Sequence, residues 1–118
     1  MHAYQSPEDL RLIPELAALA PREAQAFLAF DHVARRADGH LPAKTREWIA
    51  LAVALTTQCA YCLDVHTRAA RQLGTTPEEL AEIALVAAAV RAGATLGHGL
   101  LAMKLMGAAP PVEHQPTA

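Results

Sequence analysis

The chain has 118 residues and a formal charge of −2 at pH 7. This length predicts a single domain, and so small a charge argues against nucleic acid or an anionic membrane as a partner, because both need a basic face. Over half of the residues are apolar but only 4% are aromatic. Most of the apolar residues are alanine and leucine, which favour helix, so we expect an all-α, single-domain bundle of about six helices.

Neither a membrane span nor an export signal is expected. A bilayer span needs roughly 20 apolar residues, and the run from Ile83 to Val90 is a fraction of that. The start of the chain, MHAYQSPEDL, has no apolar centre, so we expect no signal peptide and a cytoplasmic location. In that compartment a close cysteine pair favours catalysis or metal binding over a permanent structural bridge.

The N-terminal part of the chain is predicted to form two helices. The sequence SPED from Ser6 indicates a capped helix start with a capping box, and Pro14 is expected to break or bend this helix. The second helix is expected over residues 22–37. We expect Asp38-Gly39 to end it, with Gly39 in the left-handed conformation that glycine adopts readily.

Two further helices are expected around a bend. The third is predicted over residues 42–57, and its segment 48–55 carries no charge on any side. A helix of this kind is buried on all sides, inside the domain or between subunits. The polar cluster Thr56–Gln58 predicts a bend, and a fourth helix is expected over residues 59–73, ended by Gly74.

The C-terminal part is predicted to contain two more helices and a tail. The sequence TTPEE, with Thr76 as the cap, begins the fifth helix, which we expect to end near Ala92. A sixth helix is expected over Ala94–Met106, and its glycines favour the close approach of another helix, within or between chains. Residues 107–118 include two adjacent prolines and are predicted to be a disordered tail outside the domain, which spans 1–106.

The chemically active residue types are concentrated between Glu47 and His66. Cys59 and Cys62 are the only cysteines, they form a C-x-x-C motif, and His66 follows Cys62 by four residues. If Cys59 lies at a helix N-terminus, the unpaired backbone N–H groups and the helix dipole favour a thiolate in the first turn. His66 then lies one turn along on the same face, where its imidazole can accept the thiol proton or pair with the thiolate.

Glu47 completes this set only if the chain turns back on itself. It precedes Cys59 by twelve residues, which is about 18 Å along a straight helix. With a hairpin bend near Thr57, Glu47 returns to the level of His66 and can orient the imidazole or relay a proton. We therefore predict a thiol–disulfide redox site made of Cys59, Cys62, His66 and Glu47, with no metal or cofactor.

Metal binding is the main alternative. Cys59, Cys62 and His66 can supply three zinc ligands, with His98 or a carboxylate as the fourth, although structural zinc sites usually have a second Cys/His pair at close spacing. A non-catalytic scaffold or ligand-binding protein is a third possibility. Outside the predicted site, Asp64 is interpreted as a solvated side chain and His98 as a packing or interface residue.

Together, Glu47, Cys59, Cys62 and His66 resemble the E…C-x-x-C-x-x-x-H signature of the carboxymuconolactone decarboxylase superfamily. Within it they are most similar to the alkylhydroperoxidase-D-like branch. The resemblance covers roughly Leu41–Met106, and the sequence GTTPEEL after the motif helix is also similar to that branch.

The resemblance implies an all-α fold that assembles into trimers or into hexamers built as trimers of dimers. It also implies a peroxiredoxin-like antioxidant enzyme that acts on a hydroperoxide or disulfide substrate and is reduced again by a lipoyl-bearing or other dithiol partner. By position, Cys62 would be the peroxide-attacking thiolate, Cys59 the resolving thiol, and Glu47 and His66 the proton relay. Tyr61 departs from the pattern, because well-studied peroxidases of the branch carry a second histidine there. The decarboxylases of the superfamily lack the cysteine pair, so their reaction is not implied.

Overall fold

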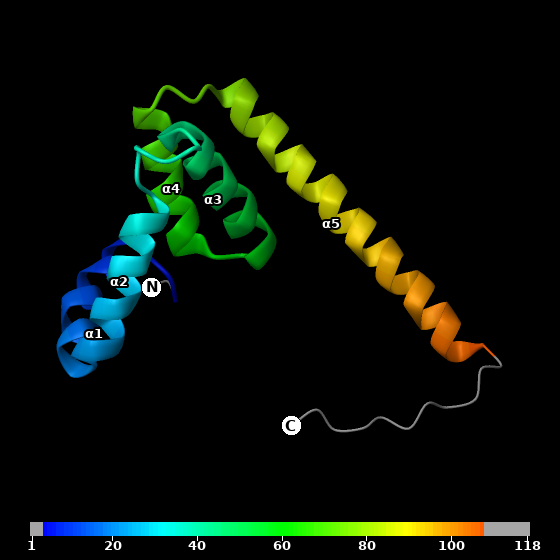
Figure 1. The fold of residues 1–118 in the computed structure, drawn as a ribbon, viewed down its shortest axis with the longest axis horizontal. Coiled ribbons are helices and arrows are strands. Elements are labelled where there is room, and N and C mark those ends of the chain that lie inside the picture. The colour runs from blue at the N-terminus through cyan, green and yellow to red at the C-terminus, as the bar shows by residue number, and fades with distance from the viewer. Residues whose placement is uncertain (1–3, 108–118) are drawn as a thin grey trace.

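The computed structural model describes residues 4–107, and all regular structure in that range is helical (Figure 1). The predicted all-α class is therefore confirmed. The predicted tail at 107–118 lies outside the described residues except for Gly107. A 3-10 helix is followed by five α-helices: η1 (Pro7–Leu12), α1 (Ile13–Leu19), α2 (Pro21–Ala34), α3 (Ala43–Thr57), α4 (Ala60–Gln72) and α5 (Pro77–Met106).

The first helical segment begins where the sequence predicts, and near Pro14, where a break or bend was expected, it changes from 3-10 helix to α-helix. The Ser6 side chain caps η1, and the Asp9 carboxylate accepts a hydrogen bond from the Ser6 N–H at 2.9 Å, which completes the capping box. Pro14 lies in the first turn of α1, where the 3-10 helix gives way to α-helix. A proline is tolerated at this position because the first turn leaves its backbone nitrogen without a helical partner.

The predicted end of α2 is wrong. The helix ends at Ala34, three residues before the expected Ala37, and Gly39 does not have the positive φ that was expected of a helix cap. A contact from α3 accounts for the difference. The Arg46 guanidinium donates to the carbonyl of Ala34 at 2.9 Å and to that of Leu41 at 3.0 Å, so a distant side chain satisfies groups that a glycine cap would otherwise satisfy.

The helices α3 and α4 pack against each other as a hairpin (Figure 1). Gln58 forms the turn with a left-handed φ of 57°, and Cys59 is the N-cap of α4. Gly74 follows α4 with a φ of 87°, so both the bend and the end of this helix are where the sequence predicts them. The small apolar core lies between α3, α4 and α5, and it consists of Leu51, Ala54, Ala70 and Ala87.

The burial predicted for α3 on all sides is not found within one chain. Leu51 is fully buried, but Ile49 and Val53 are 50% and 55% exposed. These two side chains lie on α3 outside the core, and they leave an apolar surface open. A charge-free segment, residues 48–55, that is only half covered by its own chain indicates that something else covers the remainder.

The separate sixth helix is not found, because α5 is continuous from Pro77 to Met106. A glycine inside a helix costs about 1 kcal/mol relative to alanine, which the surrounding alanines and leucines outweigh. The 30 residues of α5 extend for about 45 Å, and the second half runs away from α3 and α4 (Figure 1). The radius of gyration is accordingly 19.5 Å, against about 13–14 Å for a compact domain of this length.

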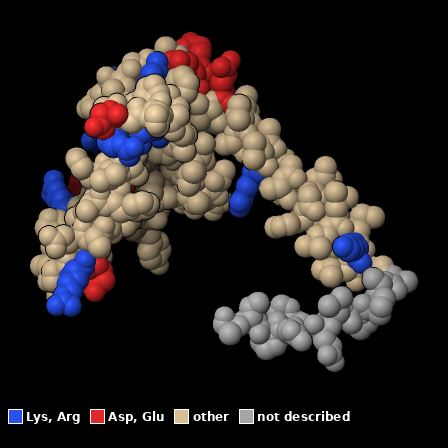
Figure 2. All heavy atoms as spheres, in the orientation of Figure 1, with Lys and Arg blue, Asp and Glu red and all other residues tan. Residues whose placement is uncertain are grey.

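Beyond Glu82, α5 carries charge only at Arg91 and Lys104, and its surface in Figure 2 is nearly uniform. By length and composition this helix is able to cross a membrane, a test that the core helices of many soluble proteins also pass. The sequence pattern did not predict such a helix, because glycine, threonine, histidine and one arginine interrupt its apolar runs.

Candidate redox site

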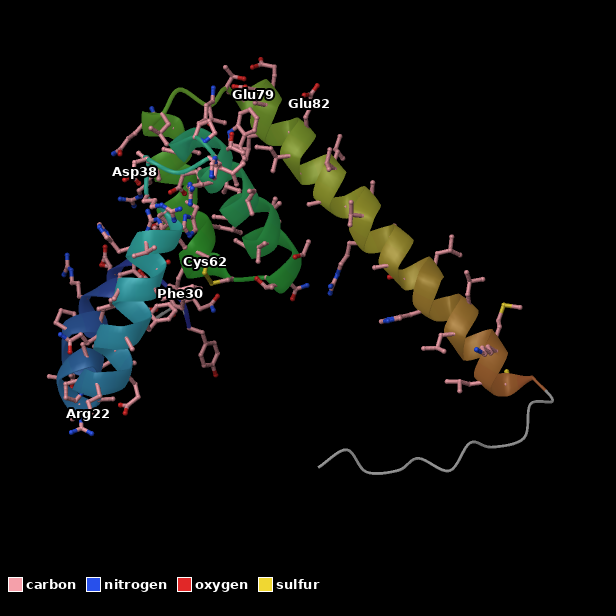
Figure 3. All side chains as sticks on the ribbon, in the orientation of Figure 1. Arg22, Phe30, Asp38, Cys62, Glu79 and Glu82 are labelled. Carbon is pink, nitrogen blue, oxygen red and sulfur yellow. A yellow bond between two sulfur atoms is a disulfide. The ribbon has the colours of Figure 1, made fainter. Side chains whose placement is uncertain are left out.

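The two cysteines form a disulfide at the start of α4 (Figure 3). Their Cα atoms are 5.3 Å apart, and the Cys62 N–H donates to the Cys59 Sγ at 3.2 Å. Both residues are half-buried. Cys59 is the N-cap and Cys62 lies in the first turn, as the sequence predicts. After reduction, the unpaired N–H groups of this helix end would favour a thiolate.

The hairpin bend brings Glu47 of α3 against His66 of α4. The Oε2 atom of Glu47 lies 2.6 Å from the Nδ1 atom of His66, and the two side chains are 7% and 15% exposed. An ionised carboxylate can only accept a hydrogen bond, so Nδ1 carries the proton of this contact. The Nε2 atom is then the ring nitrogen that is available for proton exchange. This placement is the expected one, whereas the catalytic roles of the residues stay predictions.

A third residue, Arg35, belongs to this cluster and was not detected in the sequence. Its Nε atom donates to the Oε1 atom of Glu47 at 3.3 Å, so each carboxylate oxygen has its own partner. Glu47 is the one buried charged residue among residues 4–107. Arg35 follows α2, and no sequence spacing connects the end of α2 with the first half of α3. Only the packing of the helices could have revealed it.

Tyr61, between the cysteines, is engaged by the N-terminal segment. Its hydroxyl donates to the Oδ2 atom of Asp9 at 2.7 Å. This hydrogen bond, with one from the Ser6 N–H, holds the pKa of Asp9 below its ordinary value of 3.8. The same hydrogen bond is the largest cause that raises the pKa of Tyr61 above 10.0. Tyr61 therefore anchors η1 to the motif helix, and it supplies no second imidazole to the site.

The remaining candidates lie apart from the site. Asp64, which was interpreted as a solvated side chain, is half-buried and pairs with Arg68 at 3.1 Å on α4. His98 is exposed in the second half of α5. Within the part of the chain that the structure describes, no group of three or more His, Cys, Asp or Glu side chains is placed to hold a metal ion, so the zinc interpretation gains no ligand set there.

A cavity of about 740 Å³ lies between α2, α3 and α4 and reaches the carboxylate. Glu47 and Arg35 both line it, whereas neither cysteine does. Its other polar side chains come from the end of α2 and from the end of α4, and they are Asp31, His32, Arg36 and Gln72. Glu47 and Arg35 are therefore open to this cavity, and His66 links them to the helix that carries the cysteines.

Comparisons with known proteins place the site in a family. The family model described as "Carboxymuconolactone decarboxylase family" matches residues 21–105, which include Glu47, Cys59, Cys62 and His66. "Uncharacterized protein 4 in cox locus" of Paracoccus denitrificans is 43% identical over 81 residues, which cover 69% of this chain and 72% of that protein.

Two shorter matches lie in other bacteria. An uncharacterized protein of Haemophilus influenzae is 47% identical over 57 residues, covering 48% of this chain and 49% of its own length. An uncharacterized protein of Cupriavidus necator is 38% identical over 71 residues, covering 58% of this chain and 63% of its own length. The names of the three relatives state no activity. Sequence similarity therefore assigns the family but not the reaction.

Proposed function

The chain belongs to the carboxymuconolactone decarboxylase family, and from this premise we propose that it is a thiol–disulfide oxidoreductase that reduces hydroperoxides. The observation that carries the proposal is the contact of 2.6 Å between Glu47 and His66, one helical turn from a cysteine pair at a helix start. A dithiol at a helix N-terminus supplies a nucleophile, and an oriented imidazole beside it can move the proton.

In the first proposed step, the Cys62 thiolate attacks one oxygen of the peroxide O–O bond. An S–O bond forms as the O–O bond breaks, so Cys62 is oxidised to a sulfenic acid and the peroxide is reduced. The leaving alkoxide takes a proton from His66 and departs as an alcohol. Cys62 is assigned as the nucleophile because it lies in the first turn of α4 on the same face as His66.

In the second step, the Cys59 sulfur attacks the sulfur of the sulfenic acid. The S–S bond forms, and the hydroxyl group leaves as water with the proton of the Cys59 thiol. The product is the Cys59–Cys62 disulfide, the state that the structure contains. A dithiol reductant, which we propose to be a lipoyl-bearing or similar dithiol protein, then reopens the bridge by exchange and is itself oxidised.

Glu47 and His66 are proposed to manage the protons of this cycle. Glu47 holds the Nδ1 side of the imidazole, which leaves Nε2 to accept the proton of the Cys62 thiol after reduction and to return it to the alkoxide. Because the carboxylate is buried and has a partner on each oxygen, it keeps one orientation throughout the cycle.

We also propose that the chain works as a homo-oligomer, a trimer or a hexamer. The exposed apolar side chains of α5 and of the outer face of α3 form a larger open surface than soluble monomers usually leave. A membrane is a less suitable cover, because Arg91 would lie within the hydrocarbon, where its charge costs about 2.5–3.5 kcal/mol. The expected cytoplasmic location and the absence of a membrane partner stay predictions.

Single cysteine variants test the proposed reaction. The reduced Cys59→Ser protein should consume one equivalent of hydroperoxide and leave a sulfenic acid at Cys62 that dimedone traps, whereas Cys62→Ser should consume none. A sulfenic acid on Cys59 in the Cys62→Ser variant would reverse the assignment. If the wild-type protein with a dithiol reductant consumes no hydroperoxide but still exchanges disulfides, the peroxidase proposal fails and the coarser redox function remains.

A further inference from the structure

We propose that Arg35 is a positioning residue of the redox site, acting through Glu47 on His66 and thereby on the Cys62 thiol. The inference deepens the proposed function, because it treats Glu47 and His66 as the pair that manages the thiol proton. It differs from that function in adding the residue that follows α2 to a site that is otherwise built from α3 and α4.

The geometry divides the Glu47 carboxylate between two partners. Arg35 Nε donates to Oε1 at 3.3 Å, and His66 Nδ1 lies 2.6 Å from Oε2. The carboxylate is 7% exposed, and a buried charge without a partner is strongly unfavourable. Arg35 therefore supplies an opposite charge beside Glu47, and it stops the carboxylate from rotating away from the imidazole.

Arg35 is itself held from its own helix. Its Nη1 atom lies 3.5 Å from the Oδ2 atom of Asp31, one turn earlier. The chain of contacts runs from Asp31 through Arg35 and Glu47 to His66 on the motif helix. Because the Arg35 side chain is 36% exposed, solvent in the cavity between α2, α3 and α4 reaches the guanidinium but reaches little of Glu47.

The charged and titratable groups that border Glu47 come from two neighbouring elements. From α2 and its end, Arg35 contacts the carboxylate, and Asp31, His32 and Arg36 line the same cavity. From α4, His66 contacts it directly. Of the α2 group, Arg35 is the one with a hydrogen bond to Glu47, so the effect we propose belongs to Arg35 and should be absent at its neighbour.

Removing Arg35 is expected to lower the fraction of Cys62 that is present as thiolate. With glutamine in its place, the Glu47 carboxylate loses its opposite charge and its fixed orientation, so it holds the imidazole less well. Less of the Cys62 thiol is then ionised at a given pH. We expect the alkylation rate of Cys62 at pH 6.5 to fall about fivefold, with the midpoint of its pH profile moved upward.

The experiment measures alkylation of the reduced full-length protein by iodoacetamide between pH 5 and 9. The Cys62 peptide is followed by mass spectrometry, and circular dichroism checks the fold of each variant. Arg35→Gln should show the fivefold loss, and Arg35→Lys, which keeps the charge, should recover part of it. The matched control is Arg36→Gln, because the Arg36 side chain binds Asp38 and the carbonyl of Val33 and should leave the profile unchanged.

A second background separates positioning from a general structural effect. In a Glu47→Gln protein, Arg35→Gln should cause no further change in the alkylation profile, because the residue through which it acts is gone. The proposal is overturned if Arg35→Gln lowers the Cys62 alkylation rate by the same factor in the wild-type and Glu47→Gln backgrounds. It is also overturned if Arg35→Gln alone does not change this rate, or if Arg36→Gln lowers it as much as Arg35→Gln does. Alkylation requires no peroxide, so it tests the role of Arg35 independently of the peroxidase reaction. If the variants show the expected alkylation rates but the wild-type protein consumes no hydroperoxide, only the peroxidase function is refuted.

Discussion

The α3–α4 hairpin and the helix α5 are built in opposite ways. In the hairpin, a fully buried leucine and small alanines pack beneath a charged cluster in which each oxygen of Glu47 has a partner. In α5, thirty residues carry a strongly apolar surface, yet Ala87 is the only buried one. The charged cluster of the hairpin has its partners within one chain, whereas α5 has the composition of a core helix and the exposure of a surface helix.

This difference indicates that a single chain supplies the groups of the proposed redox site, whereas the stability of the fold depends on association. The groups proposed to manage the thiol proton all come from a single copy of the chain. The apolar area that normally stabilises a domain is largely left uncovered, so we expect much of the stability to come from association.

A charge in the second half of α5 should break the assembly. Leu100 is 64% exposed in the single chain, and in an oligomer we expect it to be buried. Leu100→Glu would then place an unpaired charge in the interface, at a cost of about 3–5 kcal/mol. Light scattering at micromolar concentration should show the mass falling to that of the monomer.

The control for this variant is Leu100→Met, which keeps an apolar side chain of similar volume and should retain the assembled mass. A wild-type protein with a clean monomer mass would contradict the proposed oligomer. Recovery of the wild-type protein only from the membrane fraction would instead identify lipid as the cover of α5.

Truncating the centre of the hairpin should destabilise the fold. Leu51 is fully buried, so Leu51→Ala removes its contacts and leaves a cavity, at a cost of about 2–5 kcal/mol. The unfolding transition can be followed by the fluorescence of Trp48, the only tryptophan, whose indole N–H donates to Thr75 Oγ1 at 2.9 Å.

Val53→Ala is the matched comparison on the same helix. Val53 is exposed in the single chain, so under conditions where the protein is monomeric its truncation should change the stability little. A loss comparable to that of Leu51→Ala in the assembled protein would place the outer face of α3 in the interface. An equal loss in the monomer would contradict the core described here.

Replacing the buried Glu47 carboxylate should slow the reaction of the Cys62 thiol strongly, while the protein stays folded. Glu47→Gln keeps the shape of the side chain but removes the charge that pairs with Arg35 and His66. We expect Cys62 alkylation at pH 6.5 to fall about tenfold, and the stability to fall by about 1–3 kcal/mol. The Cys59–Cys62 disulfide should still form under an oxidant.

His66→Ala should slow alkylation in the same direction, and Arg68→Gln, an exposed position on the same helix, serves as the control. If the reactivity of both Glu47→Gln and His66→Ala equals that of the wild-type protein between pH 5 and 8, the proposed proton relay is wrong, while the roles of the two cysteines are unaffected.

The smallest expected effect concerns the link between Tyr61 and Asp9. Since the folded protein lowers the pKa of Asp9 from 3.8, its contribution to stability is present above that pH and is lost as the pH falls through the lowered value. Since it raises the pKa of Tyr61 from 10.0, that contribution is present below pH 10.0 and is lost as the pH rises through the raised value.

Hydrogen exchange in η1 and α1 measures this link. Between these two limits, Tyr61→Phe should accelerate exchange in η1 by a small factor and leave α5 unchanged, because only the hydroxyl is removed. Asp9→Asn should have a similar effect and should also weaken the capping box at Ser6. Exchange in η1 that is identical in wild-type and Tyr61→Phe proteins would show that the link does not hold this segment.

The sequence by itself determined the features that depend on neighbours along the chain. Ser6 and Thr76 begin helices because a side-chain oxygen and an acid three residues later satisfy free N–H groups locally. Cys59, Cys62 and His66 share one face of α4 because three or four residues make one turn. Glu47 could be placed beside His66 because one predicted bend sufficed to bring it there.

Only the tertiary structure decided the contacts between segments that no spacing connects. Arg35 reaches Glu47, Arg46 ends α2, and Tyr61 meets Asp9 across 52 residues of sequence. Each of these depends on how helices pack, which a local pattern does not encode. The continuity of α5 has a different cause, because it arises within the helix: cooperative hydrogen bonding along 30 residues outweighs three glycines that individually disfavour helix.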